Sequence, residues 1–132
     1  MPEIVSATLD SLVEVIGIRD AGNLSDERLL LKCKQTTNIG NIVILTGKLS
    51  GDTSVTPNRD NVYWLPDGEV TTGEYIRIYS KDGKNQKADG KYGDDPAVFH
   101  NFYWGRTSPV WVANDAAIIL TVQEWKLHKV KE

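Results

Sequence analysis

The chain of 132 residues is 40% hydrophobic and 25% charged, proportions that are typical of a globular domain and exclude disorder of the whole chain. This length suits a single domain over residues 1–132 with one hydrophobic core that needs no metal or disulfide. Fifteen basic and eighteen acidic residues give a net charge of −3. Binding of nucleic acid is therefore a less favoured hypothesis, because it would depend on a local basic patch.

The start of the chain does not look like a secretion signal. Met1-Pro2-Glu3-Ile4 has no basic start, and no apolar run follows it. No stretch of the sequence is apolar for long enough to cross a bilayer. We therefore expect a soluble protein, cytoplasmic by default, with no membrane partner.

The single cysteine, Cys33, excludes an intrachain disulfide. It alternates with Lys32 and Lys34, and this pattern predicts a small buried hydrophobic side chain. A nucleophilic cysteine needs a neighbouring base, and neither histidine is close to Cys33 in the sequence.

Short runs rich in Val, Ile, Leu, Tyr and Trp are separated by Gly, Pro, Asn and Asp, which is the pattern of an all-β domain. Residues 26–34 contain good helix formers after a candidate cap at Ser25, but their apolar side chains recur at every second position, so a strand explains them better. The sequence does not decide whether residues 20–27 contain one helical turn. The nine predicted strands, which fit a sandwich or a barrel, are residues 12–19, 28–34, 41–46, 62–65, 74–80, 98–105, 110–112, 116–122 and 125–130.

Alternation indicates which face of a strand is buried. In residues 74–80, Ile76 and Ile78 share one face, whereas Tyr75, Arg77 and Tyr79 share the other. We expect the isoleucines in the core and the aromatic–arginine face partly covered by a loop. Residues 116–120 are apolar on both faces, which favours a central strand.

Turn residues delimit these strands. Pro66-Asp67-Gly68 and Thr71-Thr72-Gly73-Glu74 predict tight turns, because proline presets φ and glycine accepts positive φ. Residues 81–96 are almost wholly polar, and a loop of that length is either functional or disordered. A second polar stretch covers residues 48–61.

The run from Tyr63 to Tyr79, Tyr-Trp-Leu-Pro-Asp-Gly-Glu-Val-Thr-Thr-Gly-Glu-Tyr-Ile-Arg-Ile-Tyr, resembles the middle of the lamin tail domain family. In that family an aromatic-rich strand ends in a proline–glycine turn, and a second glycine precedes a strand of Glu-Tyr-Val-Arg-Val character. Tyr103-Trp104-Gly105 and the run of residues 110–120 resemble its second signature, in which a tryptophan, an asparagine, an aspartate and an apolar strand follow in order. Residues 27–31 and 39–44 fit two earlier strands, so the resemblance covers about residues 9–122.

The resemblance implies an immunoglobulin-like β-sandwich of about eight or nine short strands, without catalytic residues. Members of that family serve as interaction modules in filament proteins and as accessory domains beside secreted bacterial hydrolases and nucleases. The resemblance leads us to expect a protein partner or self-association, but it does not indicate a particular ligand.

No nucleotide-binding glycine loop, zinc spacing or nucleophile elbow is present, so we expect no enzyme, no metal and no cofactor. His100 could act as a general base, but a partly exposed strand histidine is the better interpretation, and His128 is expected in solvent.

Several aspartates are weaker candidates for chemistry. Asp89, Asp94 and Asp95 could bind calcium, but they lack the spacing of a known calcium loop. Two carboxyl groups could also pair for acid–base catalysis, but the sequence does not show which aspartates lie close in space. The candidates are Asp10, Asp52, Asp60 and Asp115.

Aromatic residues are dense between residues 92 and 111, and Arg106 lies among them. Aromatic and arginine side chains are over-represented at binding hot spots. Most of these rings should fill the core, and the residues proposed for binding are Tyr92, Phe99, His100 and Arg106.

The preferred hypothesis is a non-catalytic protein-binding or assembly module that uses residues 81–96 and the nearby aromatic rings. The alternative is a carbohydrate- or nucleic-acid-binding domain, with coplanar exposed rings or a basic strip of Arg77, Lys81, Lys84 and Lys87. The least favoured hypothesis is a small metal-dependent hydrolase built from the aspartates.

Overall fold

The computed structural model describes residues 12–51, 54–112 and 115–130, and their regular structure is almost entirely β-strand. The predicted all-β fold class is therefore confirmed. The helical structure in these residues is one 3₁₀ turn, η1 (Ile39–Asn41), and no helix among them is long and apolar enough to cross a membrane. The strands are β1 (Val13–Arg19), β2 (Arg28–Cys33), β3 (Thr37–Asn38), β4 (Ile42–Ser50), β5 (Ser54–Trp64), β6 (Glu69–Val70), β7 (Tyr75–Tyr79), β8 (Gln86–Tyr92), β9 (Asp95–Tyr103) and β10 (Asp115–Thr121).

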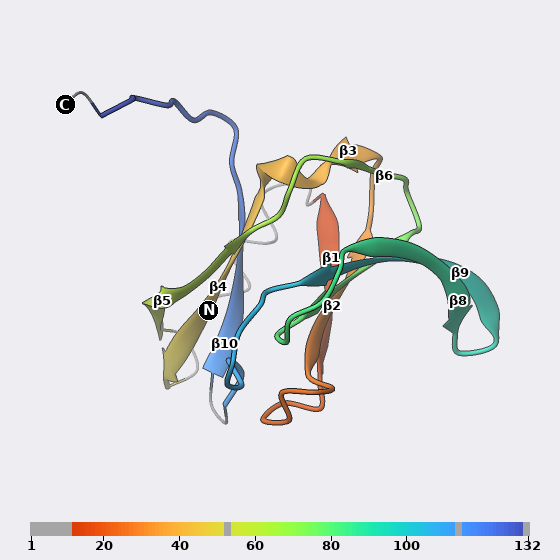
Figure 1. The fold of residues 1–132 in the computed structure, drawn as a ribbon, viewed down its shortest axis with the longest axis horizontal. Coiled ribbons are helices and arrows are strands. Elements are labelled where there is room, and N and C mark those ends of the chain that lie inside the picture. Colours follow the sequence, from red (N-terminus) through yellow and green to blue (C-terminus); the bar gives the residue numbers. More distant parts are fainter. Residues whose placement is uncertain (1–11, 52–53, 113–114, 131–132) are drawn as a thin grey trace.

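The larger sheet contains five strands in the order β1-β2-β7-β9-β8. Its neighbours are antiparallel except β7 and β9, which run parallel. A parallel pair needs a connection that returns the chain to the same end of the sheet. Here β8 makes that connection and then pairs with the far side of β9, so the β8–β9 hairpin curves away from the rest of the molecule (Figure 1).

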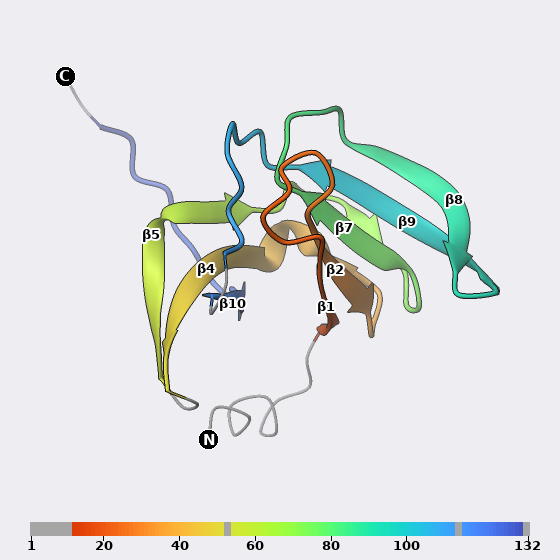
Figure 2. The same ribbon diagram turned by 90° about the horizontal axis from the view of Figure 1, so that it is seen from below.

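The smaller main sheet contains three antiparallel strands in the order β10-β4-β5. It forms a second layer on one side of the larger sheet, and the two layers are separate in both ribbon views (Figures 1 and 2). The short strands β3 and β6 pair at one end of the molecule.

The core lies between the two main sheets, because each of them turns one apolar face inward. Ile76 and Ile78 of β7 are 0% and 1% exposed, which confirms their predicted place in the core. Cys33 is also buried, as predicted. The other buried members of this cluster are Val13, Leu29, Leu31, Ile39, Ile42, Ile44, Leu65, Val70, Phe102, Val110 and Trp111.

The predicted turn at residues 71–74 is confirmed. The N–H of Glu74 donates to the carbonyl of Thr71 at 3.0 Å, and Gly73 has a φ of +89°, a conformation that glycine adopts without steric cost. At the other predicted turn, the chain bends at Asp67 between β5 and β6. The turn at Asp67 separates β5 from β6, and the turn at residues 71–74 separates β6 from β7.

The prediction of one long loop over residues 81–96 is wrong from residue 86 onward. Residues 86–92 form β8, and Asp95 already begins β9, with Gly93 at a φ of +63° in the turn between them. The polar sequence misled the prediction because β8 is an edge strand that is exposed over almost its whole length. An edge strand is held by its backbone ladder and needs few apolar side chains. In the second polar stretch, residues 48–50 and 54–61 likewise lie in strands, the end of β4 and most of β5, which pair with each other.

Two predicted strands are absent from the described residues. Residues 110–112 have no strand partner, although Val110 and Trp111 are buried and fill the core as irregular chain. Residues 125–130 are exposed and extend away from the sheets (Figure 1). The apolar run of residues 116–120 does lie in a strand, β10, but within the described residues β10 pairs with β4 alone and is an edge strand, not the predicted central one.

Candidate functional site

Two of the four predicted binding residues, Tyr92 and Phe99, meet on the outer face of the larger sheet. The ring of Tyr75 lies between them, with its centroid 4.8 Å from that of Tyr92 and 5.4 Å from that of Phe99. The register explains this contact, because Tyr75 of β7 is opposite Phe99 of β9. Tyr92 is 39% exposed, whereas Phe99 is buried, so only the outermost ring faces solvent.

Cations cover the rings of this face. The guanidinium of Arg77 lies 3.9 Å from the Phe99 ring centroid and donates through Nε to Asn101 Oδ1 at 2.7 Å. Lys81 Nζ is 5.3 Å from the centroid of Tyr79, whose other neighbour is the stacked ring of Tyr103 at 5.2 Å. We call this layer the aromatic–cation face, which consists of Lys32, Tyr75, Arg77, Tyr79, Lys81, Tyr92, Phe99 and Tyr103.

We predicted that a loop would partly cover the aromatic–cation face, and the loop between β7 and β8 does cover it beside Tyr103. Gly83, in the loop between β7 and β8, lies so close to the Tyr103 ring that a Cβ atom at this position would collide with it. Asn85 Oδ1 of the same loop accepts a hydrogen bond from the Tyr103 N–H at 3.1 Å. The aromatic–cation face is therefore largely packed against itself and this loop.

His100 does not belong to this face, because neighbouring residues of a strand point to opposite sides. Its Nε2 atom lies 2.9 Å from Oε1 of Glu74, and both side chains are mostly buried. Partial burial favours the neutral form of Glu74, but hydrogen bonds from the Thr71 N–H and from His100 outweigh it and lower the pKa of this carboxyl. The pair joins the turn before β7 to β9.

Arg106 is also remote from the rings. Its backbone N–H donates to the Ser80 carbonyl at 2.8 Å, and its Nη1 is 3.4 Å from the Asp60 carbonyl of β5. The four predicted binding residues are thus divided among three places, and they do not form one site.

The aspartates form no cation site in the part of the chain that the structure describes, where no three Asp, Glu, His or Cys side chains are close enough to hold a metal ion. Asp10 and Asp52 lie outside the described residues. Asp60 borders an open depression of about 650 Å³ on the β4–β5 hairpin, beside Lys48 and Asn58. His128 is exposed near the end of the chain, as predicted.

Cys33 has the properties of a packing residue. Burial raises the pKa of its thiol, the nearby charge of Glu74 raises it further, and a backbone hydrogen bond of Gln35 opposes both effects. A thiol of this kind is a weak nucleophile at neutral pH, because the thiolate is the reactive form.

The side chain of Glu27 is buried and has no cationic partner among the described residues. Its Oε1 accepts from the Gly22 N–H at 2.9 Å, and its Oε2 accepts from the Val110 N–H at 2.8 Å and from the hydroxyl of Ser80. These hydrogen bonds attach the β1–β2 loop to the end of β7 and to the chain that follows β9. Glu27 therefore stabilises the fold through two buried hydrogen bonds and one that is partly buried.

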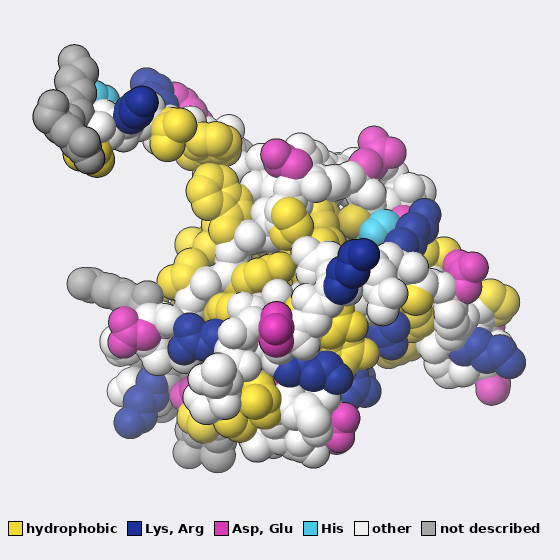
Figure 3. Space-filling model, viewed as in Figure 1, with side chains coloured by type: hydrophobic (Ala, Val, Ile, Leu, Met, Phe, Trp, Pro, Cys, Tyr) yellow, Lys and Arg dark blue, Asp and Glu magenta, His cyan; other side chains and the backbone are white. Residues whose placement is uncertain are grey.

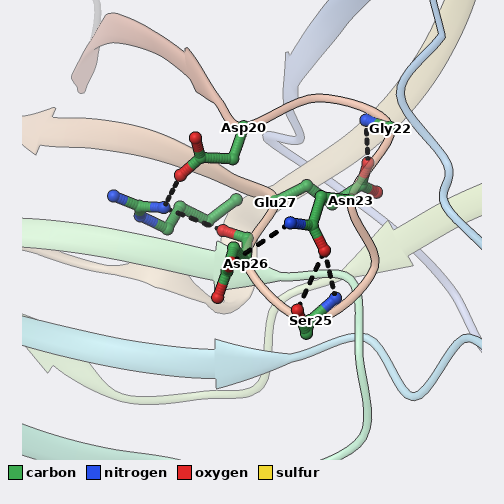
Figure 4. A network of polar contacts seen from close by, with 7 residues as sticks. Asp20, Gly22, Asn23, Ser25, Asp26 and Glu27 are labelled. Carbon is green, nitrogen blue, oxygen red and sulfur yellow. Dashed lines mark hydrogen bonds and ion pairs between the residues drawn. The ribbon is translucent and has the colours of Figure 1, made fainter.

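The loop that carries Glu27 is closed by its own polar side chains (Figure 4). Asn23 Oδ1 accepts from the N–H and the hydroxyl of Ser25, and Asn23 Nδ2 donates to Asp26. The Asn23 N–H donates to the Asp20 carbonyl at 3.1 Å, and the Glu27 N–H donates to the Asn23 carbonyl at 2.7 Å. Residues 20–27, where one helical turn was an open possibility, therefore contain hydrogen-bonded turns and no helix. Arg28 and Asp20 form an ion pair at 2.7 Å beside it.

The feature that sequence reasoning missed is the outer side of the smaller sheet. Ile42 and Ile44 of β4 and Ile119 of β10 face the core, so the residues between them face outward. The register then places the outward residues in rows across β10, β4 and β5. The rows are Leu120–Val43–Trp64 and Ile118–Leu45–Val62, followed by Ala116–Gly47 and Leu49–Val55.

Almost all these outward side chains are apolar, and many are in contact with solvent. Exposed fractions are 42% for Leu49, 42% for Val55, 44% for Val62, 49% for Trp64 and 46% for Leu120. We call this surface the apolar outer face, made of Val43, Leu45, Leu49, Val55, Val62, Trp64, Ala116, Ile118 and Leu120.

Gly47 lies in the middle of the apolar outer face. A Cβ atom there would lie 2.5 Å from Val55 Cγ2 and 2.7 Å from Ile118 Cδ1. The glycine therefore allows the side chains of β5 and β10 to close over β4, so that the face is continuous.

Trp125 extends the apolar outer face beyond the sheet. Its ring stands perpendicular to that of Trp64, with centroids 5.3 Å apart, and it is 57% exposed. Hydrophobic side chains continue from the body of the molecule along this C-terminal stretch (Figure 3). Trp64 is fixed from its other side, because its Nε1 donates to the Gly40 carbonyl at 2.6 Å.

Comparison of the chain with protein-family models, with curated proteins and with solved structures found no match.

Proposed function

We propose that the protein is a non-catalytic binding or assembly module whose contact surface is the apolar outer face. The observation that carries this proposal is the continuous apolar surface on one side of the β10-β4-β5 sheet, in which five large hydrophobic side chains (Leu49, Val55, Val62, Trp64 and Leu120) are each more than two-fifths exposed. A soluble monomer normally turns polar residues outward on the solvent side of an antiparallel sheet. Contiguous exposed apolar surface is instead typical of protein–protein contact sites.

The energetic argument favours a protein as the occupant of this face. Removing apolar surface from water contributes roughly 25 cal/mol per Å², so several half-exposed Val, Leu and Trp side chains supply substantial binding free energy. Trp64 has the properties of a hot-spot residue, since it is a half-exposed tryptophan that is held by a hydrogen bond to Gly40. The apolar outer face carries no convergent polar groups of the kind that fix a small ligand.

The immunoglobulin-like fold and the kinship with lamin tail domains belong to this proposal. In an immunoglobulin sandwich, strands A, B and E are neighbours in one sheet, and F, C and C′ are neighbours in the other. The orders β1-β2-β7 and β10-β4-β5 match these two sets when the strands are taken in chain order. The β8–β9 hairpin would then be an addition beside strand E.

The alternative, a carbohydrate- or nucleic-acid-binding domain, has one observation in its favour, the association of Lys32, Arg77 and Lys81 with aromatic rings. A stacking platform, however, needs free ring faces. Here the rings stack on one another or lie under a cation. The predicted basic strip is also divided, because Lys87 is opposite His100 and lies on the other side of the sheet from Arg77.

Analytical ultracentrifugation of the full chain over a wide concentration range tests the proposal. We expect concentration-dependent association that Val62→Lys abolishes while the protein stays folded. Val15→Lys is the matched control, because Val15 is an equally exposed valine (47% against 44%) on β1 of the other sheet. Association that Val62→Lys leaves unchanged, or a wild type that is monomeric at every concentration, would contradict the assembly role of the apolar outer face.

A further inference from the structure

The backbone of β10 is paired on only one of its two edges in the described residues. The Val122 N–H donates to the Asn41 carbonyl at 2.7 Å, in continuation of the β10–β4 register. In an antiparallel ladder, hydrogen-bonded and non-hydrogen-bonded pairs alternate, so the odd-numbered residues of β10 direct their N–H and C=O groups away from β4. The inner residues of this open edge are Ala117, Ile119 and Thr121.

Residues 123–130, which we call the C-terminal segment, have the sequence of a strand but no strand partner. Trp125 and Leu127 alternate with Lys126 and His128, the period-two pattern that predicted a strand here. In the structure the segment extends away from the sheets (Figure 1), and Leu127 and Val130 are 86% and 81% exposed. Within the described residues, the segment contacts the rest of the protein through the ring of Trp125, which packs against the ring of Trp64.

The open edge and the C-terminal segment are complementary. A half-paired strand presents a row of unsatisfied hydrogen-bonding groups, and an extended segment with alternating apolar side chains satisfies them by adding one strand. In an antiparallel addition, the end of the segment, which carries Lys129, meets the start of β10, which carries Asp115. Leu127 then lies beside Ala117, and Trp125 lies beside Ile119, nearer the other end of β10, where Leu120 is 46% exposed.

We propose that the C-terminal segment of one copy adds as an antiparallel strand to the open edge of β10 in a second copy. This inference rests on the proposed function and names its partner, which is the same chain. The segment already points away from its own β10, so a neighbouring copy can receive it without refolding of the sandwich. Exchange of an identical element between copies is a common route to a dimer, because each copy offers the same segment and the same edge.

Hydrogen exchange measured by NMR on the full chain, at a concentration where it associates, tests the pairing directly. We expect the amides of Ala117, Ile119 and Thr121 to exchange at least about tenfold more slowly than in the Leu127→Asp variant. Ile118 and Leu120 supply the internal control, because their amides bond to β4 and stay protected in both proteins. Equal exchange of the edge amides in the wild type and in Leu127→Asp would overturn the proposal.

A mixed sample distinguishes exchange between copies from a hairpin within one copy. Half of the chains carry ¹⁵N and the other half carry ¹³C-labelled leucine and isoleucine methyl groups. We expect nuclear Overhauser effects between the Leu127 methyls of one copy and the β10 amides of another. Contacts that appear in uniformly labelled protein but not in the mixed sample would show an internal hairpin and would also overturn the proposal.

Two matched variants separate this inference from the proposed function. Leu127→Asp places a charge on the apolar side of the segment and should raise the dissociation constant of the dimer about tenfold or more, whereas His128→Asp on the other side should leave it nearly unchanged. If Leu127→Asp associates like the wild type while Val62→Lys does not, the apolar outer face is the contact surface and the C-terminal segment takes no part. If neither variant changes the association, both proposals fail.

Discussion

The buried carboxylate of Glu27, at the start of β2, accepts a hydrogen bond of 2.8 Å from the backbone N–H of Val110, 83 residues later in the chain. Two other donors, the Gly22 N–H and the Ser80 hydroxyl, complete its coordination. No cation takes part in these contacts, and the partners of the carboxyl group are two backbone N–H groups and a hydroxyl. Glu27 connects the β1–β2 loop and the end of β7, which lie at the same end of the larger sheet, to the irregular chain that fills the core with Trp111.

Glu27→Gln should lower the free energy of unfolding by about 2–4 kcal/mol, because an amide NH₂ must face at least one buried donor in place of a carboxylate oxygen. Urea denaturation followed by circular dichroism measures the loss as a lower midpoint at unchanged m. Glu14→Gln, on the exposed side of β1, is the control and should change stability by less than about 0.5 kcal/mol. Equal losses in the two variants would show that the buried hydrogen bonds contribute little.

The Glu74–His100 pair predicts a specific dependence of stability on pH. Since the pKa of Glu74 is lowered in the folded protein, its contribution is complete above the pKa of an unfolded glutamate and is lost as the pH falls through the lower, folded value. Urea midpoints measured from pH 6 down to acid should therefore fall less steeply in Glu74→Gln than in the wild type. Glu69→Gln, at an exposed neighbouring position, should keep the wild-type slope. Identical slopes in all three proteins would contradict this role of Glu74.

The buried thiol of Cys33 should resist modification. At pH 8, Ellman's reagent should react with the native protein far more slowly than with the chain in concentrated guanidinium chloride, because burial both raises the pKa of the thiol and blocks access. Absorbance of the released thiolate follows the reaction. A native rate close to the denatured rate would place Cys33 at the surface.

Arg77 should be hard to replace, even by lysine. Its planar guanidinium lies over Phe99 and donates to Asn101, and an ammonium group reproduces neither contact. We expect Arg77→Lys to reduce the free energy of unfolding by about 1 kcal/mol. Arg19→Lys, at an exposed position of β1, should be neutral by the same urea measurement. A neutral Arg77→Lys would show that the aromatic–cation face does not depend on the planar group.

The sequence predicted the fold class and the inner face of the larger sheet, because alternation in β2 and β7 places Leu29, Leu31, Ile76 and Ile78 on one side. The prediction failed at β8, because the polar residues of this strand have the composition of a loop. Pairing along an edge is a property of the backbone, and side-chain pattern reports it poorly. The prediction failed again at residues 110–112, where the buried Val110 does not need a strand partner because Glu27 accepts its N–H.

The candidate site was harder to predict than the core. Residues 116–120 are apolar on both sides, a pattern that ordinarily indicates burial on both faces. The structure leaves one of those faces in solvent, so the same pattern marks a contact surface. The signal was therefore in the sequence, but only the position of β10 at the side of a three-stranded sheet revealed its meaning. Tyr92, Phe99, His100 and Arg106 were grouped by closeness in sequence, which strand alternation then separated.

The pairing of β10 with β4 also sets the order in which the protein can be completed during synthesis. Strand β4 (residues 42–50) is made first, and its partner β10 (residues 115–121) emerges from the ribosome only after the five strands β5 to β9. Until then the β4–β5 hairpin lacks a neighbour on one side, and its apolar residues have no finished core to pack against. Long-range pairing of this kind slows folding and exposes a hairpin that attracts other strands. Nascent chains of this protein should therefore depend most on chaperones in the interval before β10 appears.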